Sequence, residues 1–234
     1  RGAGILIVED PRKEMEIFYV DGWGRYFDEV SGKELEAKGV TKARVEEMIE
    51  VAKHRVYDKV PIAQCFEDTG AAPIKVRWLD INKGDELSPE YRSRLVAMEI
   101  KKDNRKDLFA PTPPLEAKKI LFAMAVTEGY GFEEGKEKEG MKLDFVDVRR
   151  AFFHADCIRK VYVQLCEEDW EEGMCGKLNK AMYGTRDAAQ NWAEAYMGFM
   201  VKSGFTRGRA SPCVFWHEER NIRAVGHGDD FIVL

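Results

Sequence analysis

The sequence has no long apolar run, and no stretch approaches the roughly 20 residues that a membrane-spanning helix needs. Neither an initiator Met nor a signal-peptide pattern stands at Arg1, so we expect an excerpt of an intracellular protein that has no membrane partner. The five cysteines stand far apart, and none belongs to a CxxC or Cys/His pair with zinc-site spacing. We therefore expect reduced thiols rather than a disulfide framework.

An excess of positive charge is also missing, because the formal net charge is −5. That value disfavours a nucleic-acid partner, since affinity for a phosphate backbone comes chiefly from Lys and Arg. The charges are unevenly distributed, however: residues 75–119 carry 11 basic and 8 acidic side chains, and residues 177–209 carry 6 and 2. A local positive groove is compatible with this pattern. A solvated surface of mixed sign explains it equally well.

The periodicity of apolar residues predicts an α+β fold, in which helices interleave with antiparallel hairpins and no regular βαβ repeat occurs. Helices are expected at 41–57, 116–127 and 187–202, the last with Trp192, Tyr196 and Phe199 on one buried face. Strands are expected at 5–8, 74–79, 94–100, 142–148, 161–165, 214–217 and 222–227, with turn residues at 82–85. The expected domains are an N-terminal lead-in at 1–58, which holds an amphipathic helix, and a main domain at 59–234.

Two adjacent aspartates, Asp229 and Asp230, stand inside an otherwise apolar run. A buried or half-buried carboxylate must find a cation, and a metal ion would serve. Side chains of neighbouring strand residues point to opposite faces, so a shared metal site requires a turn at this place. Gly228 permits a type II′ hairpin turn with His227 and Asp230 at its corners. The alternative is a polar hairpin turn that binds nothing.

A third acid, Asp147, ends the strand predicted at 142–148, and residues 151–153 are expected to pack beneath it. Two-metal catalysis of phosphoryl transfer needs carboxylates from separate strands that converge on ions about 3.5–4 Å apart. One aspartate at a strand end and an aspartate pair in a hairpin would supply them. Asp144 lies three residues before Asp147, so we expect it to face the other side of the strand and the solvent.

Over about residues 73–234, a series of short motifs resembles that of copia-type (LTR retrotransposon) reverse transcriptases. No single motif is decisive, but eight or more in the same order are specific. The motifs are Arg92-Ser93-Arg94-Leu95-Val96-Ala97, Phe109-Ala110-Pro111, Asp147-Val148-Arg149-Arg150-Ala151-Phe152-Phe153, Val161-Tyr162-Val163-Gln164, Lys177-Leu178, Tyr183-Gly184, Trp192, Gly204-Phe205, Ser211-Pro212-Cys213-Val214 and Asp229-Asp230.

The resemblance implies an RNA-directed DNA polymerase with right-hand fingers and palm, whose antiparallel palm sheet packs on helices. By position, Asp147, Asp229 and Asp230 are implied to be the catalytic residues and the ligands of two Mg²⁺ ions, with Mn²⁺ as a substitute. The implied partners are an RNA or DNA template with its primer, deoxynucleoside triphosphates and the remainder of the retrotransposon polyprotein. The implied location is a cytoplasmic particle or the nucleus.

Five further positions are implied to bind substrate. Phe152 takes the place of the family's aromatic residue that rejects the ribose 2′-hydroxyl by steric clash. Tyr183 and Gly184 would lie along the incoming nucleotide and the template. Arg92 and Arg94 resemble finger residues that reach the nucleotide's phosphates.

The chain departs from the family pattern at two places. The usual hairpin begins Tyr-Val-Asp-Asp, whereas this chain has His227-Gly228-Asp229-Asp230, and the usual Gln-Ala-Pro after Tyr183-Gly184 is replaced by Asp187-Ala188-Ala189. A catalytically inactive retrotransposon relic or nucleic-acid-binding fragment is therefore an alternative, and so is an unrelated globular binding module whose acidic turn is incidental. No thumb can fit after Leu234, so we expect weak or no activity from these residues alone.

Overall fold

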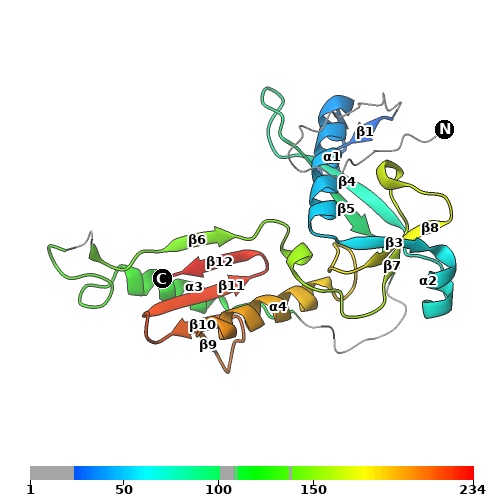
Figure 1. The fold of residues 1–234 in the computed structure, drawn as a ribbon. Coiled ribbons are helices and arrows are strands. Elements are labelled where there is room, and N and C mark those ends of the chain that lie inside the picture. The colour runs from blue at the N-terminus through cyan, green and yellow to red at the C-terminus, as the bar shows by residue number, and fades with distance from the viewer. Residues whose placement is uncertain (1–23, 101–107, 109, 137–138) are drawn as a thin grey trace. The chain divides into compact units, whose positions relative to one another are not determined.

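A computed structural model describes residues 24–100, 108, 110–136 and 139–234, and the chain divides into two compact units. Unit 1 combines Arg1–Lys102 with Cys157–Arg186, and unit 2 combines Asp103–Asp156 with Asp187–Leu234. Blue and yellow ribbons therefore meet in unit 1, whereas green and red ribbons meet in unit 2 (Figure 1). Each unit is built from two stretches of chain that are far apart in the sequence.

Unit 1 packs helices on small antiparallel sheets with the strand orders β1-β2, β4-β5 and β3-β8-β7. The helix α1 packs against β5, and α2 packs against β8. Its helices and strands are β1 (Tyr26–Phe27), β2 (Glu34–Leu35), α1 (Ala37–Lys53), β3 (Tyr57–Pro61), α2 (Ile62–Thr69), β4 (Val76–Asn82), β5 (Tyr91–Ala97), β7 (Tyr162–Val163), the 3-10 helix η3 (Glu167–Asp169) and β8 (Met174–Leu178).

The first predicted helix is shifted toward the N-terminus, because α1 spans Ala37–Lys53 rather than 41–57. It ends early because Arg55 adopts a φ of +49° and Tyr57 pairs with Leu178 in the sheet. The boundary expected at residue 58 falls inside β3, and the strand expected at 5–8 lies outside the described residues.

The predicted hairpin of residues 74–100 is confirmed, with slightly different bounds. β4 and β5 pair in antiparallel register from Val76↔Ala97 to Asn82↔Tyr91. The connection therefore spans residues 83–90 and is longer than a tight turn at 82–85. Arg92 and Arg94 alternate with buried residues along β5, so both lie on the face of the hairpin that is turned away from the core.

A buried ion-pair network ties α1 to the β4–β5 hairpin. The Arg44 guanidinium donates to both carboxylate oxygens of Asp80, at 3.2 and 2.6 Å, and lies 3.3 Å from Glu168. It also stacks between the rings of Tyr26 and Trp78, 4.7 and 5.0 Å from their centroids. One cation therefore contacts two carboxylates and two aromatic rings, and it joins α1 to β4 and η3.

Unit 2 is a five-stranded antiparallel sheet with the order β6-β12-β11-β10-β9. The helices predicted at 116–127 and 187–202 and the strands predicted at 214–217 and 222–227 are confirmed. The helices and strands of the unit are α3 (Leu115–Ala125), β6 (Asp144–Asp147), the 3-10 helix η2 (Ala151–His154), α4 (Ala188–Lys202), β9 (Thr206–Arg207), β10 (Val214–His217), β11 (Ile222–His227) and β12 (Asp230–Val233).

The two long helices of unit 2 cover opposite faces of this sheet. Leu121 of α3 packs in one core cluster with Val225 of β11. On the other face, Tyr196 of α4 meets Phe215 and Phe231 edge-on, with ring centroids 6.2 and 5.2 Å apart. Directly opposed residues of antiparallel strands share a face, so Val214, Val225 and Ile232 form the α3 side.

The predicted buried face of α4 is correct for two of its three aromatic residues. Trp192 and Tyr196 are buried, whereas Phe199 is 67% exposed. The prediction for Phe199 is wrong, because helical spacing places a side chain on a face but does not ensure that the whole length of that face is covered.

The α+β class predicted from the sequence is confirmed by this mixture of helices and antiparallel sheets. All five cysteines are free thiols, as expected, and four of them are buried. No helix in the described part of the chain is long and apolar enough to cross a membrane.

Candidate carboxylate site

The Gly228-Asp229 turn joins β11 to β12, with His227 paired to Asp230. Gly228 has a φ of +67°, whereas Asp229 is not among the residues with positive φ. A type II′ turn needs positive φ at its first central residue only, while type I′ needs it at both, so the expected turn type fits. A Cβ at Gly228 would meet nothing within 4 Å, so the need for glycine is conformational rather than steric.

Strand β6 brings Asp147 to the same place, because it pairs with β12 in the register Asp230↔Asp147. The next residue forms a second link between the two segments, because the Val148 amide donates to the Asp229 carbonyl at 2.9 Å. Directly opposed side chains in antiparallel strands have Cβ atoms about 4.5–5.5 Å apart. All three predicted aspartates are therefore gathered at one end of the unit 2 sheet, and the direct partner of Asp147 is Asp230.

The three aspartates are exposed, which corrects the expectation of a buried or half-buried pair. Their apolar neighbours in β11 and β12 are covered by helices, but the turn extends past that cover. Desolvation therefore does not force a cation onto this site. Mutual repulsion does favour one, because like charges directly opposite each other across two strands are destabilising. Within the described residues, none of the three carboxylates forms an ion pair or a side-chain hydrogen bond.

The donor chemistry of this site fits a hard divalent cation, because carboxylate oxygens are the ligands that Mg²⁺ prefers. The side chains are not gathered around a common point, since no group of three His, Cys, Asp or Glu side chains in the described part of the chain could hold a metal ion. Exposed side chains change rotamer within nanoseconds. Because the three side chains are exposed, their carboxylates are free to rotate toward an ion.

A contact that the sequence did not predict lies beside the turn. The Lys118 ammonium of α3 is 2.9 Å from Nδ1 of His227, and His227 shares its sheet face with Asp230. A lysine ammonium can only donate, so the imidazole accepts at Nδ1. Positive charge is thereby brought close to the carboxylates. No local signal could have shown this contact, because the two residues are 109 positions apart.

Asp144 confirms the expected alternation along β6. It is exposed and lies opposite Val233, on the face of the sheet that Asp147 does not share. Phe152 lies in η2, five residues beyond Asp147, between two buried neighbours, and is itself half-buried. Part of its side chain is therefore open to solvent.

The other four predicted substrate residues belong to unit 1, and three of them are neighbours. The Arg94 guanidinium stacks over the Tyr183 ring at 5.0 Å, and the Ala97 amide donates to the Tyr183 carbonyl at 2.7 Å. Gly184 has a φ of +82°, and a Cβ there would lie 1.9 Å from the Ala97 carbonyl oxygen. Glycine is required at this position by both conformation and space. Arg92 is exposed on the same hairpin face as Arg94.

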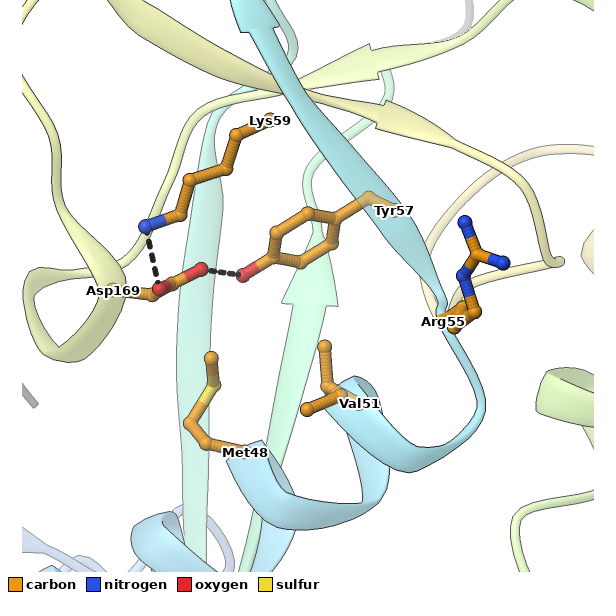
Figure 2. A pocket seen from close by; sticks show the side chains of 7 residues that line it. Met48, Val51, Arg55, Tyr57, Lys59 and Asp169 are labelled. Atoms are coloured by element: carbon orange, nitrogen blue, oxygen red, sulfur yellow. Dashed lines mark hydrogen bonds and ion pairs between the residues drawn. The ribbon is translucent and has the colours of Figure 1, made fainter. Parts of the chain in front are cut away.

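Unit 1 also contains a pocket of about 380 Å³, lined by Met48, Val51, Ala52, Arg55, Tyr57, Lys59 and Asp169 (Figure 2). Asp169 accepts hydrogen bonds from the Tyr57 hydroxyl at 2.7 Å and from the Lys59 ammonium at 2.8 Å. Burial raises the pKa of Tyr57 far above its usual range, so the hydroxyl stays a donor. Tyr57, Lys59 and Asp169 thus satisfy one another, Arg55 pairs with Asp58 outside the pocket, and none of the predicted site residues lines it. The carboxylates, not this pocket, are the better candidate site.

Comparisons with known proteins place these residues in context. Residues 64–233 match the family model described as "Reverse transcriptase (RNA-dependent DNA polymerase)". The chain is 25% identical over 210 residues to the Retrovirus-related Pol polyprotein from transposon TNT 1-94 of Nicotiana tabacum. That match covers 85% of this chain and 15% of the polyprotein, so the chain spans only a small part of its relative's length.

Proposed function

Because the chain belongs to the reverse transcriptase (RNA-dependent DNA polymerase) family, we propose that its carboxylate site performs nucleotidyl transfer for a copia-type retrotransposon polyprotein. The substrates would be deoxynucleoside triphosphates and a primer on an RNA or DNA template. The observation that carries the proposal is the register of β6 and β12, which sets Asp147 opposite Asp230 beside the turn that holds Asp229. The resemblance to copia-type enzymes, which the order of motifs indicated, is confirmed by the comparisons.

Asp147, Asp229 and Asp230 would hold two Mg²⁺ ions, for which Mn²⁺ could substitute. The bound ions would supply positive charge to the attacking and leaving oxygens of the phosphoryl transfer. The protein's own contribution is to present carboxylate oxygens from two paired strands, whose ladder keeps the backbone positions fixed. Repulsion between the Asp147 and Asp230 carboxylates would favour cation binding by this pair.

The remaining proposed roles belong to side chains in both units, which would form the palm and fingers of a right-hand polymerase. Phe152 would exclude the ribose 2′-hydroxyl, since it lies on the 3-10 helix that follows Asp147 and its side chain is partly exposed. Arg92 and Arg94 would bind phosphates, because both guanidinium groups lie on the outer face of one hairpin. The stacking of Arg94 on Tyr183 would align that ring and Gly184 with the nucleotide and template.

The direct test is to titrate the full 234-residue chain with Mn²⁺ and to measure the bound Mn²⁺ by electron paramagnetic resonance. We expect Asp147→Asn, Asp229→Asn and Asp230→Asn each to weaken Mn²⁺ binding about tenfold or more, since each removes a ligand charge. Asp144→Asn is the matched control, because Asp144 is exposed on the same strand but faces the other side. Equal loss in the control would mean that the affinity reflects general acidity and would refute the proposed site.

Primer extension on poly(rA)/oligo(dT) with Mg²⁺ then separates the enzyme from the inactive alternative. Incorporation that Asp229→Ala abolishes supports the enzyme, and incorporation that survives this substitution reveals a contaminant. Binding of the primer–template without incorporation, by a chain extended into the downstream polyprotein, would identify a nucleic-acid-binding relic instead.

A further inference from the structure

Trp192 of α4 makes a polar contact with the turn between β11 and β12. Its indole Nε1–H donates to the carbonyl oxygen of Gly228 at 2.7 Å. The side chain is only 7% exposed, and a buried indole N–H needs an acceptor. The acceptor it uses is the carbonyl of the peptide that leads directly into Asp229.

The hydrogen bond from Trp192 holds the Gly228 carbonyl, which the ladder of β11 and β12 does not hold. The ladder of β11 and β12 ends at the pair His227↔Asp230, and the Asp229 carbonyl accepts from the Val148 amide, so neither of these backbone ties reaches the Gly228 carbonyl. Gly228 has more conformational freedom than any other residue type. Rotation of the Gly228-Asp229 peptide would swing the Asp229 carboxylate, and a hydrogen bond to that peptide's carbonyl opposes the rotation.

The same indole ring also contacts the segment that follows Asp147. Its centroid lies 6.5 Å from the His154 ring of η2, and α4 packs along η2. On the other side it meets the Tyr196 ring at 5.5 Å, and Tyr196 in turn contacts Phe231 of β12. One buried side chain therefore contacts both the turn that holds Asp229 and the 3-10 helix that follows Asp147.

We infer that Trp192 is a positioning residue for the carboxylate site: its N–H fixes the peptide before Asp229, and its ring holds η2 against the same turn. The inference rests on the proposed function, because a positioning role presupposes that the aspartates act together. Core packing alone, which the helical spacing predicted, would require the ring but not the N–H. Removing the indole N–H while keeping the ring therefore distinguishes the positioning role from core packing.

The test removes only that donor. Replacing Trp192 with 3-benzothienylalanine keeps the bicyclic ring and substitutes sulfur for the N–H, and Trp192→Phe is the genetically simpler variant. Tyr196→Phe is the matched control, since it alters a buried aromatic residue one helical turn away that makes no hydrogen bond to the Gly228-Asp229 turn. Circular dichroism and thermal melting establish that each variant is folded.

We expect hydrogen–deuterium exchange to rise in the peptide that spans residues 227–231 in both Trp192 variants and to stay at the wild-type rate in Tyr196→Phe. Mn²⁺ affinity should fall about tenfold in the Trp192 variants, as it does when outer-shell partners of metal ligands are removed. Either unchanged exchange at the turn or unchanged Mn²⁺ affinity in the benzothienyl variant would overturn the inference.

The two proposals fail in different ways. If wild-type Mn²⁺ binding is insensitive to Asp147→Asn, the proposed function fails, and exchange at the turn still decides whether Trp192 holds it. If Mn²⁺ binding depends on Asp147 but not on the Trp192 N–H, the proposed function stands and the positioning role is refuted.

Discussion

Asp147 and Asp230 face each other across the β6–β12 pair, and both carboxylates are exposed. Removing one charge relieves repulsion, so Asp147→Asn should raise the free energy of unfolding by about 0.2–1 kcal/mol in EDTA. In millimolar Mn²⁺ the wild-type protein should instead be the more stable of the two, because only the wild-type protein gains the full free energy of Mn²⁺ binding. Urea unfolding in the two buffers measures both effects. A variant that is less stable than wild type in EDTA would contradict the repulsion, and Asp144→Asn, whose strand partner is Val233, should change little.

Gly184 and Gly70 offer a matched pair, since both adopt positive φ but only Gly184 is crowded. Gly70→Ala should cost about 1 kcal/mol from left-handed strain alone. Gly184→Ala adds a clash with the Ala97 carbonyl and should cost a further ~1–3 kcal/mol, together with displacement of Tyr183. Urea unfolding gives both values. Similar losses of unfolding free energy at the two positions would contradict the prediction, because they would show that the loop after Tyr183 moves to relieve the clash.

Arg44 should be far more important for stability than an exposed cation in an equally short ion pair. Arg44→Met leaves the buried Asp80 carboxylate and the half-buried Glu168 carboxylate without their cation and should lower the free energy of unfolding by about 3 kcal/mol or more. Lys33→Met breaks the exposed 2.6 Å pair with Glu86 and should change it by less than about 1 kcal/mol. Thermal and urea denaturation test the ranking, which equal effects would refute.

Asp28 should contribute stability that depends on pH. Hydrogen bonds from the Asn82 and Ser31 amides lower the pKa of Asp28 from 3.8 to about 2. The folded state therefore favours the ionised form, and the stabilisation is present above about pH 4 and is lost as the pH falls toward 2. Asp28→Asn should be less stable than wild type at pH 6, and the gap should narrow between pH 4 and 2. A gap that stays constant through this range in urea titrations would contradict the assignment.

Sequence reasoning succeeded where the structure is set by neighbours along the chain. The strands at 214–217 and 222–227 and the turn at Gly228 follow from alternation and from the conformational needs of a two-residue hairpin. The residues proposed for metal binding were found in the same way, since each carboxylate stands at a strand end or in a turn. Their meeting at one end of the sheet required only that β6 pair with β12.

It failed where distant segments decide the outcome. The helix α1 ends early because Tyr57 enters a sheet with Leu178, more than a hundred residues away, and β8 itself had no clear local signal. The contact of Lys118 with His227 and the hydrogen bond from Trp192 to the turn are likewise invisible to periodicity. The exposure of the aspartates was misjudged because apolar neighbours in a strand do not show where the covering helices end.

The alternation of the chain between the two units affects the order in which they can form during synthesis. The chain passes from one unit to the other three times, so neither unit corresponds to an uninterrupted piece of the gene. Unit 1 has all its parts once residue 186 has left the ribosome, whereas unit 2 still lacks α4 and strands β9 to β12. At that stage β6 has no strand to pair with, and Asp147 stands alone. Within these 234 residues, Asp147 can therefore pair with Asp230 only after every residue of unit 1 has been synthesised.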